Sequence, residues 1–237
     1  MLNMSLKSKI SLIPWDGDSA AHRQSLTKQR VECSWDHEKV EEVWREQQLK
    51  GEKCIYWIVI FFHDSVQYEK IKDHLDVGKG NGTLYDTATS INGVLRDPSQ
   101  RSFVPIGHVS LDPRNPDAEG VGLDLPSERV FWIKTFFVSQ ALQSQGYGRA
   151  TMDEVENMAI QEPLCAKILM LDTVHNDDQK REDFAMVTFG RIPKVTNEEW
   201  YSRRGFKLIK TVENYYKVAD RNGKVWATRT VFMRKDI

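Results

Sequence analysis

The stretch FFVSQALQSQGYGRA, residues 136–150, decides how the rest of the sequence is interpreted. It starts at the end of an apolar run, Val130 to Val138, and passes through polar residues to Gly146 and Gly148. Apolar residues then recur at helical spacing between Met152 and Ala159. The pattern predicts a buried strand, a glycine turn and a helix.

A glycine turn at the start of a helix suits phosphate. Glycine lets the backbone approach a ligand closely, and the first amides of the helix point at that ligand with the positive end of the helix dipole. The Walker pattern is absent, and the dinucleotide pattern G-x-G-x-x-G fails because Thr151 stands three positions after Gly148. What fits is Q-x-x-G-x-G, written by Gln143, Gly146 and Gly148.

Composition narrows the class of protein. The chain has 237 residues and a net charge of −1 with acids and bases interspersed, so we expect no nucleic-acid or membrane partner. Its three cysteines, widely spaced, predict neither a disulfide framework nor a zinc site, and the histidines show no metal-binding spacing. No signal peptide or membrane span is evident. We expect a cytoplasmic protein without a metal, the nucleus being the alternative.

The first quarter of the chain predicts two strands around two largely polar helices. In the second helix Asp36 is the expected cap, and Val40, Val43 and Trp44 are expected on one face. The apolar, β-branched run that follows predicts a buried strand. These four elements are expected at residues 9–15, 19–31, 36–51 and 54–62.

A polar segment at about 63–102 predicts a functional lid or a mobile insertion. Its centre, GKGNG at 78–82, is interpreted as a flexible turn rather than a second phosphate site, because no strand leads into a helix there. The strand expected at 103–111 contains Pro105 and Gly107, which favour an irregular or edge position.

The last third predicts a buried strand, a polar connection, a short helix and a hairpin. Asn222-Gly223 between two strand-like runs is the strongest hairpin signal in the chain. The expected ranges are 167–174 for the strand, 177–196 for the connection, 197–204 for the helix, and 207–218 and 224–234 for the hairpin strands.

The glycine turn, together with this order of elements, resembles the GNAT (GCN5-related N-acetyltransferase) superfamily over essentially the whole chain. NEEWYSRRGF at 197–206 is similar to that family's N-x-x-x-Y-x-x-x-G-F. The resemblance implies one α/β (α+β) domain over 1–237, with insertions at about 63–102 and 177–196. Its core would be a twisted, mixed sheet of about six to seven strands, flanked by helices and completed by a C-terminal β-hairpin.

The resemblance also implies acetyl-CoA as co-substrate. The strand end at 136–138 takes the place of the family's L-x-V, whose backbone pairs with pantetheine. Gln140 stands where many members have proline and Ser144 where many have glycine, and both are tolerable if backbone amides make the contacts. Arg149 is either an ion pair to phosphate or a solvated charge. The cofactor-binding candidates are Phe136, Phe137, Val138, Gln143, Ser144, Gln145, Gly146, Tyr147, Gly148, Arg149 and Asn197.

For catalysis the resemblance implies that Tyr201 protonates the departing thiolate, whereas its alternative role is to pack the helix on the sheet. The strand before the loop carries Lys134 where many relatives have an acid, and we interpret Lys134 as an outward or paired charge. The base that deprotonates the amine is Asp172, His108, His175 or an ordered water. The catalytic candidates are Tyr201, Asp172 and His108.

The leading hypothesis is therefore an acetyl-CoA-dependent N-acetyltransferase. A primary amine of a small molecule, amino acid or peptide would attack the thioester directly in a ternary complex, with a backbone amide near Val138 supporting the oxyanion. The alternative is an acyl-CoA-binding or interaction module without turnover, since fold does not guarantee activity. The sequence identifies neither the acceptor nor the oligomeric state.

Overall fold

The computed structural model describes residues 10–60, 82–216, 218–219 and 224–237. The GKGNG segment apart from Gly82, residues 63–81 of the 63–102 insertion and the Asn222-Gly223 turn lie outside these residues. Backbone contacts group into two compact units, Met1–Asp112 with Thr135–Leu164, and Pro113–Lys134 with Cys165–Ile237. We call them unit 1 and unit 2 and describe each by itself. The single-domain organisation stays a prediction.

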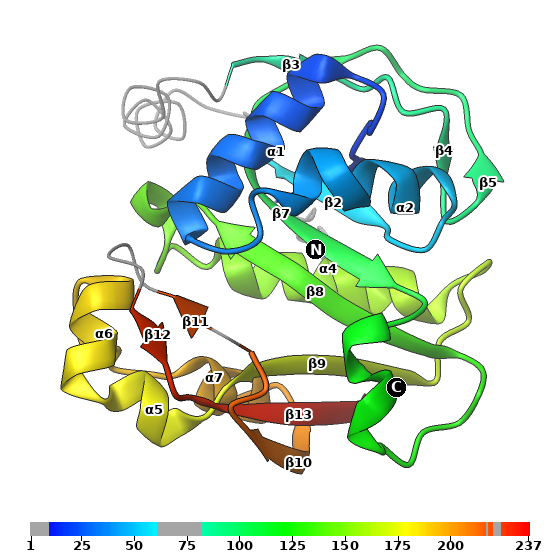
Figure 1. Cartoon of the computed structure of the whole chain (residues 1–237). Coiled ribbons are helices and arrows are strands. Elements are labelled where there is room, and N and C mark those ends of the chain that lie inside the picture. Colours follow the sequence, from blue (N-terminus) through cyan, green and yellow to red (C-terminus); the bar gives the residue numbers. More distant parts are fainter. Residues whose placement is uncertain (1–9, 61–81, 217, 220–223) are drawn as a thin grey trace, which may run out of the picture. The chain divides into compact units, whose positions relative to one another are not determined.

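The main sheet confirms the predicted fold class. Over the described residues it has seven strands, hydrogen-bonded in the order β1-β2-β7-β8-β9-β13-β10 (Figure 1). It is mixed, because β8 and β9 are parallel whereas β9 and β10 each pair antiparallel with β13. The strands are β1 (Ser11–Pro14), β2 (Ile55–Val59), β7 (Pro105–Asp112), β8 (Val130–Val138), β9 (Ile168–Val174), β10 (Lys207–Glu213) and β13 (Arg229–Asp236).

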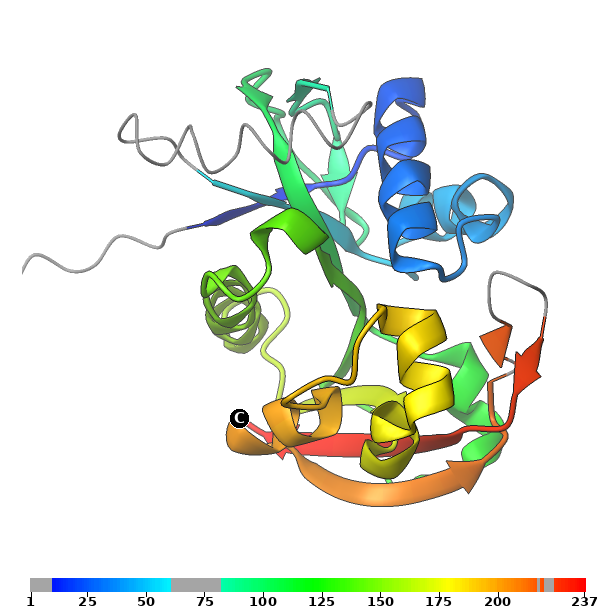
Figure 2. The same ribbon diagram turned by 90° about the vertical axis from the view of Figure 1, so that its left-hand side faces the viewer.

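In unit 1, two helices cover opposite faces of the strands (Figure 2). They are α1 (Ala20–Cys33), capped by the Ser19 side chain, and α4 (Tyr147–Ile160). Between α1 and β2 lie a π-helical turn, η1 (Val40–Trp44), and α2 (Arg45–Leu49). Val43 is exposed, so its predicted place on a face with Val40 and Trp44 was wrong. The π turn shifts it away from the core that those two residues join.

Of the two positions that the sequence predicted for β7, irregular or edge, the structure shows the irregular one. Its pairing with β2 shifts register between Gly107 and Pro105, and it lies between β2 and β8 in the sheet. The described part of the predicted insertion forms two small ladders. They pair β3 (Leu84–Tyr85) with β6 (Ser102–Phe103) and β4 (Ser90–Ile91) with β5 (Val94–Leu95).

In unit 2 the predicted polar connection at 177–196 was wrong, because it contains two helices, α5 (Asn176–Lys180) and α6 (Glu182–Phe189). Phe184 of α6 is fully buried and packs edge-on against Trp226. With α7 (Asn197–Arg203), these helices lie together over β9 and β13 (Figure 2). Eight residues make only two turns, too short for their periodicity to stand out.

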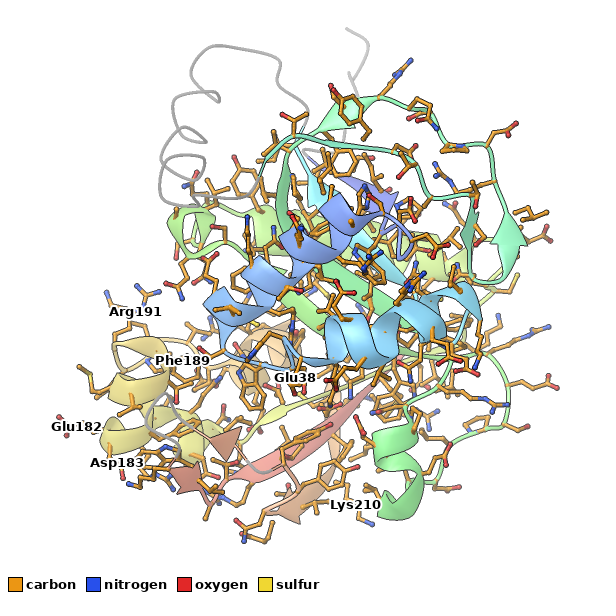
Figure 3. All side chains as sticks on the ribbon, turned by 45° about the horizontal axis from the view of Figure 1, so that its top comes forward. Glu38, Glu182, Asp183, Phe189, Arg191 and Lys210 are labelled. Carbon is orange, nitrogen blue, oxygen red and sulfur yellow. The ribbon has the colours of Figure 1, made fainter. Side chains whose placement is uncertain are left out.

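The predicted helix at 197–204 and the terminal hairpin are confirmed. Thr196 and Glu199 form a reciprocal capping box that starts α7. β10 pairs with β13, and a smaller ladder joins β11 (Val218–Ala219) to β12 (Val225–Trp226). Two 3-10 turns, η2 (Pro116–Val121) and η3 (Gln140–Leu142), complete the described elements. Lys210 of β10 donates to the Val121 carbonyl at 2.5 Å, reaching η2 (Figure 3).

Candidate functional site

The segment after β8 is anchored to unit 1 at its start. The Ser139 amide donates to the Ile106 carbonyl at 2.9 Å, which ties the strand end to β7. The Gln143 side chain turns back and donates from Nε2 to the Val138 carbonyl at 3.0 Å. Gln143 therefore fixes the entrance to the loop, and its contact with the cofactor stays a prediction.

Beyond Gln143 the backbone donors are unengaged. From Ser144 to Arg149, no amide donates a hydrogen bond to any residue that the structure describes. Gly146 is the N-cap of α4 with φ 89°, and its carbonyl accepts the first helical bond, from the Ala150 amide at 3.0 Å. Six consecutive free amides at the start of a 14-residue helix form an anion-binding arrangement, and they fit a diphosphate.

The same loop is open to solvent. Ser144, Gln145, Gly146 and the Arg149 side chain are exposed, and only Tyr147 is buried, at 8% exposure. Tyr147 thus holds the start of α4 on the unit while its neighbours stay accessible. Both interpretations of Arg149 remain open.

The C-terminal end of β8 is closely packed against β7. Phe137 and Val138 are buried and Phe136 is half-buried. A Cβ added to Gly107 of β7 would lie 2.2 Å from the Phe137 carbonyl oxygen. Only glycine permits this close approach of the two strands, which fixes the backbone that the resemblance assigns to pantetheine.

His108, a candidate base, lies in the core of unit 1. Its Nδ1 is 2.7 Å from the Gln29 Oε1, and its Nε2 is 3.4 Å from the Arg30 Nη1. The side chain is fully buried. Burial lowers the pKa of His108 well below its usual value, and the charges of Arg30 and Lys53 lower it further. The ring is therefore neutral, with both nitrogens engaged.

Asp172, the other candidate base, belongs to a polar cluster in unit 2. The Lys134 Nζ lies 3.3 Å from the Asp172 Oδ1, 3.1 Å from the Asn115 Oδ1 and 3.3 Å from the Tyr216 hydroxyl. The Asn115 Nδ2 also donates to the Asp172 Oδ1, at 3.4 Å. We call these four residues the Asp172 cluster. Lys134 is thus a paired charge, as the sequence indicated.

Burial and the Asp172 carboxylate raise the pKa of two nearby tyrosines, Tyr216 and Tyr201. Burial and the nearby Asp172 carboxylate raise the pKa of Tyr216, which also hydrogen-bonds to that carboxylate. Burial, followed by Asp172, raises the pKa of Tyr201 as well. Both phenols are accordingly protonated at neutral pH and able to donate a proton.

Tyr201 also has a packing role. Its ring makes edge contacts with Trp200 and Phe206, at centroid distances of 5.0 and 5.8 Å. Asn197 begins α7, where its amide donates to the Gln179 Oε1 at 2.7 Å. His175 is the N-cap of α5, and its Nδ1 accepts from the Asp177 amide at 3.2 Å.

The sequence missed the residues around the Lys134–Asp172 pair. Asn115 bonds to Asp172, and Tyr216 and Asp117 lie 3.3 and 3.7 Å from the Lys134 Nζ. The available signal was a single charge inside each of two apolar strands, Lys134 in VFWIKTFFV and Asp172 in ILMLDTV. In the part of the chain that the structure describes, no three His, Cys, Asp or Glu side chains are grouped to hold a metal ion. No helix found there has the length and apolarity needed to cross a membrane.

Comparison with protein-family models matches residues 68–189, just over half of the chain, to the acetyltransferase (GNAT) family. The chain belongs to the GNAT family. The matched GNAT region contains the glycine loop, His108, Lys134 and Asp172 but ends before α7. Membership therefore rests on residues 68–189 and is independent of Tyr201.

Solved structures of the GNAT fold are similar over almost the full length. Arabidopsis thaliana NAA60 in complex with a bisubstrate analogue is 14% identical with a TM-score of 0.52, covering 96% of this chain and 99% of that one. A spermidine N-acetyltransferase SpeG chimera from Vibrio cholerae and hSSAT is 11% identical with a TM-score of 0.51, covering 97% and 96%. At these identities the likeness concerns the fold alone. No curated protein matches the sequence.

Proposed function

We propose that this GNAT protein is an N-acetyltransferase that uses acetyl-CoA and transfers the acetyl group directly to a primary amine. The observation that carries the proposal is the run of free amides from Ser144 to Arg149 at the start of α4. The three free cysteines suit a reducing compartment, the cytoplasm or nucleus.

The loop is the part that holds the cofactor. Its free amides bind the diphosphate, and the strand end at 136–138 lies alongside the pantetheine arm as an added strand. Bound acetyl-CoA supplies the thioester whose acetyl group is transferred. The loop needs no charged side chain for this, which is consistent with serine standing at position 144.

Tyr201 is the proposed proton donor to the leaving thiolate. Burial and Asp172 raise its pKa, so the phenol carries its proton at neutral pH and donates a hydrogen bond to the departing sulfur. The same contacts that pack its ring hold the hydroxyl in one direction, since aromatic neighbours restrict both side-chain torsions.

Of the two candidate bases, Asp172 is better placed than His108 to interact with the acceptor amine. The Asp172 side chain is 10% exposed and its electrostatic partners include Tyr201, whereas His108 is enclosed and already has both nitrogens engaged. The Lys134 ammonium competes for the same carboxylate. We therefore propose that Asp172 chiefly attracts the cationic acceptor, and that water takes the released proton.

Binding of acetyl-CoA to Gly146→Trp tests the cofactor site. A Cβ at Gly146 meets nothing within 4 Å, so the indole finds room but covers the free amides. Gly190→Trp is a matched control, because Gly190 also has a left-handed φ, 68°, and an open Cβ position, at the end of α6. Calorimetry should show at least a hundredfold weaker binding for Gly146→Trp alone. Equal affinity in both variants and wild type contradicts the site.

Turnover separates the transferase from a module that binds acyl-CoA without transferring the acetyl group, the alternative suggested by the pairing of Asp172 with Lys134. Free thiol is followed with a panel of small amines, amino acids and peptides. In the transferase, thiol release depends on the amine and falls at least tenfold in Tyr201→Phe, while acetyl-CoA binds as in wild type. Slow thiol release that no amine accelerates would instead identify a binding module.

A further inference from the structure

One residue of β8 departs from extended backbone. Thr135 has φ 50°, in the left-handed region, and within Val130–Val138 it alone has a positive φ. A β-branched side chain is strongly disfavoured there. Such an outlier persists only where its surroundings hold it, and it often marks a functional constraint.

A buried network in unit 1 holds this residue. The Thr135 hydroxyl donates to the Ser110 Oγ at 3.1 Å, and Ser110 donates to the Asp112 Oδ2 at 3.0 Å. The Lys53 Nζ donates to Asp112 at 2.9 Å and to Ser110 at 3.2 Å. We call Lys53, Ser110, Asp112 and Thr135 the Thr135 clamp. Its first three members are each at most 6% exposed.

The clamp resists movement because its charges are buried and mutually satisfied. The Asp112 Oδ1 also accepts from the Cys54 amide at 2.8 Å, so the carboxylate is fixed by groups on both sides. A buried ion pair of this kind adds little net stability compared with apolar residues. A fully satisfied polar network does, however, fix one geometry.

The clamp lies directly before residues 136–138, the segment proposed to receive the pantetheine arm. The chain leaves unit 1 after Asp112 and returns at Thr135, directly before Phe136–Val138. The pairing of β8 with β9 stops at Trp132, so β9 contributes no ladder beyond that residue. The position of the returning strand is therefore set by its hydrogen bonding to β7, by the clamp at its start and by the Gly107 contact at Phe137.

We propose that Thr135 is a positioning residue, whose hydroxyl holds the backbone of 136–138 in the direction that acetyl-CoA requires. The inference rests on the proposed function, since it assumes that this segment receives the pantetheine arm. It concerns a hydroxyl that does not itself touch the cofactor.

The test compares Thr135→Val, which keeps the shape and removes the donor, with Thr135→Ser, which keeps the donor. Thr151→Val is the matched control, because it deletes another buried threonine hydroxyl of unit 1, bonded to the Tyr147 carbonyl at 2.9 Å. Two quantities are measured, the acetyl-CoA dissociation constant and the hydrogen-exchange rates of the 136–138 amides. Thr135→Val should bind roughly tenfold more weakly and exchange roughly tenfold faster, the effect of about one hydrogen bond.

Thr135→Ser and Thr151→Val should stay within about twofold of wild type in both measurements. Unchanged affinity and exchange in Thr135→Val overturn the inference, and so does equal loss in Thr135→Ser. If Thr135→Val does not fold, Ser110→Ala removes the acceptor of the same bond and is judged by the same criteria. If wild type binds no acetyl-CoA, the proposed function fails and the cofactor role of Thr135 falls with it. The exchange rates then decide alone whether Thr135 holds the strand.

Discussion

The loop at 144–149 and the Asp172 cluster differ in whether their polar groups have hydrogen-bond partners within the protein. The loop has six backbone amides without a hydrogen-bond partner among the described residues. In the cluster, Lys134 contacts three acceptors and Asp172 is bonded by Lys134 and Asn115. The first region is prepared for a ligand from outside, whereas the second is satisfied by the protein itself.

This difference determines how each region responds to change. Amides without a partner in the protein lose no hydrogen bond when a neighbouring side chain is removed. A substitution that covers the loop should therefore weaken the binding of acetyl-CoA and hardly change the free energy of unfolding. A half-buried, closed cluster exposes an unmatched charge when one member is removed, so damage should appear first in stability. Measuring both quantities on variants of each region tests the contrast.

The largest effect on stability is expected for Lys134→Met. Its removal leaves the Asp172 carboxylate, 10% exposed, with only neutral partners in the cluster. We expect a loss of about 3 kcal/mol in the free energy of unfolding, as for other broken buried pairs. Urea denaturation at pH 7 measures it.

A double variant, Lys134→Met with Asp172→Leu, sharpens this prediction. Because it removes the unmatched charge as well, it should be more stable than Lys134→Met alone. Lys180→Met is the exposed control, since the Lys180–Glu199 pair is partly solvated at 43% and 29% exposure. If Lys134→Met is no less stable than this control, the cluster is not closed and the contrast with the loop fails.

In unit 1, Asp86 and Arg96 form a second polar group that the protein itself satisfies, and its contribution to stability can be measured through its dependence on pH. Asp86 accepts from Arg96 at 2.6 and 2.8 Å and from the Ser99 amide and hydroxyl. The Arg96 guanidinium lowers the pKa of Asp86 from 3.8 to about 2. A lowered folded-state pKa stabilises the fold above about pH 4, and this contribution is lost as the pH falls towards 2.

We therefore expect Arg96→Met to lose about 2 kcal/mol at pH 7, and progressively less below pH 4. Urea denaturation of variant and wild type at pH 7, 4 and 3 gives the dependence. Arg45→Met, which breaks an exposed pair with Asp18, should lose about 0.5 kcal/mol or less. A loss in Arg96→Met that stays constant down to pH 3 would show that its cause is packing and that Asp86 plays no part.

The same contrast explains what the sequence could predict. The loop is encoded in consecutive residues, so glycine spacing and a following helical period were sufficient to find it. The Asp172 cluster joins residues 57 and 82 positions apart, and no local pattern connects Asn115 to Asp172 or Lys134 to Tyr216. Only the fold brings such residues together.

Local preference also concealed the backbone conformation of Thr135. Thr135 is a β-branched residue in a β-branched and aromatic run, where propensity favours an ordinary strand and gives no sign of a left-handed residue. The long strands of the main sheet, β8 among them, were predictable because their apolar runs are long. What remained hidden depends on tertiary contacts, such as the hydroxyl of Ser110.

The smallest effect should come from Ser144→Gly, within the loop itself. Ser144 has φ 65° and is exposed, so glycine relieves a left-handed residue without removing a buried contact. We expect a gain of about 0.5 kcal/mol in unfolding free energy, the relief being partly offset by the greater freedom of glycine in the unfolded chain. Gly146→Ala should do the reverse and lose about 1 kcal/mol through backbone strain alone, because its Cβ meets nothing within 4 Å.

The affinity of Ser144→Gly for acetyl-CoA should stay within about twofold of wild type, since backbone amides make the contacts. A marked fall in that affinity would show that the Ser144 hydroxyl itself binds the cofactor, and that this loop recognises more than its backbone presents.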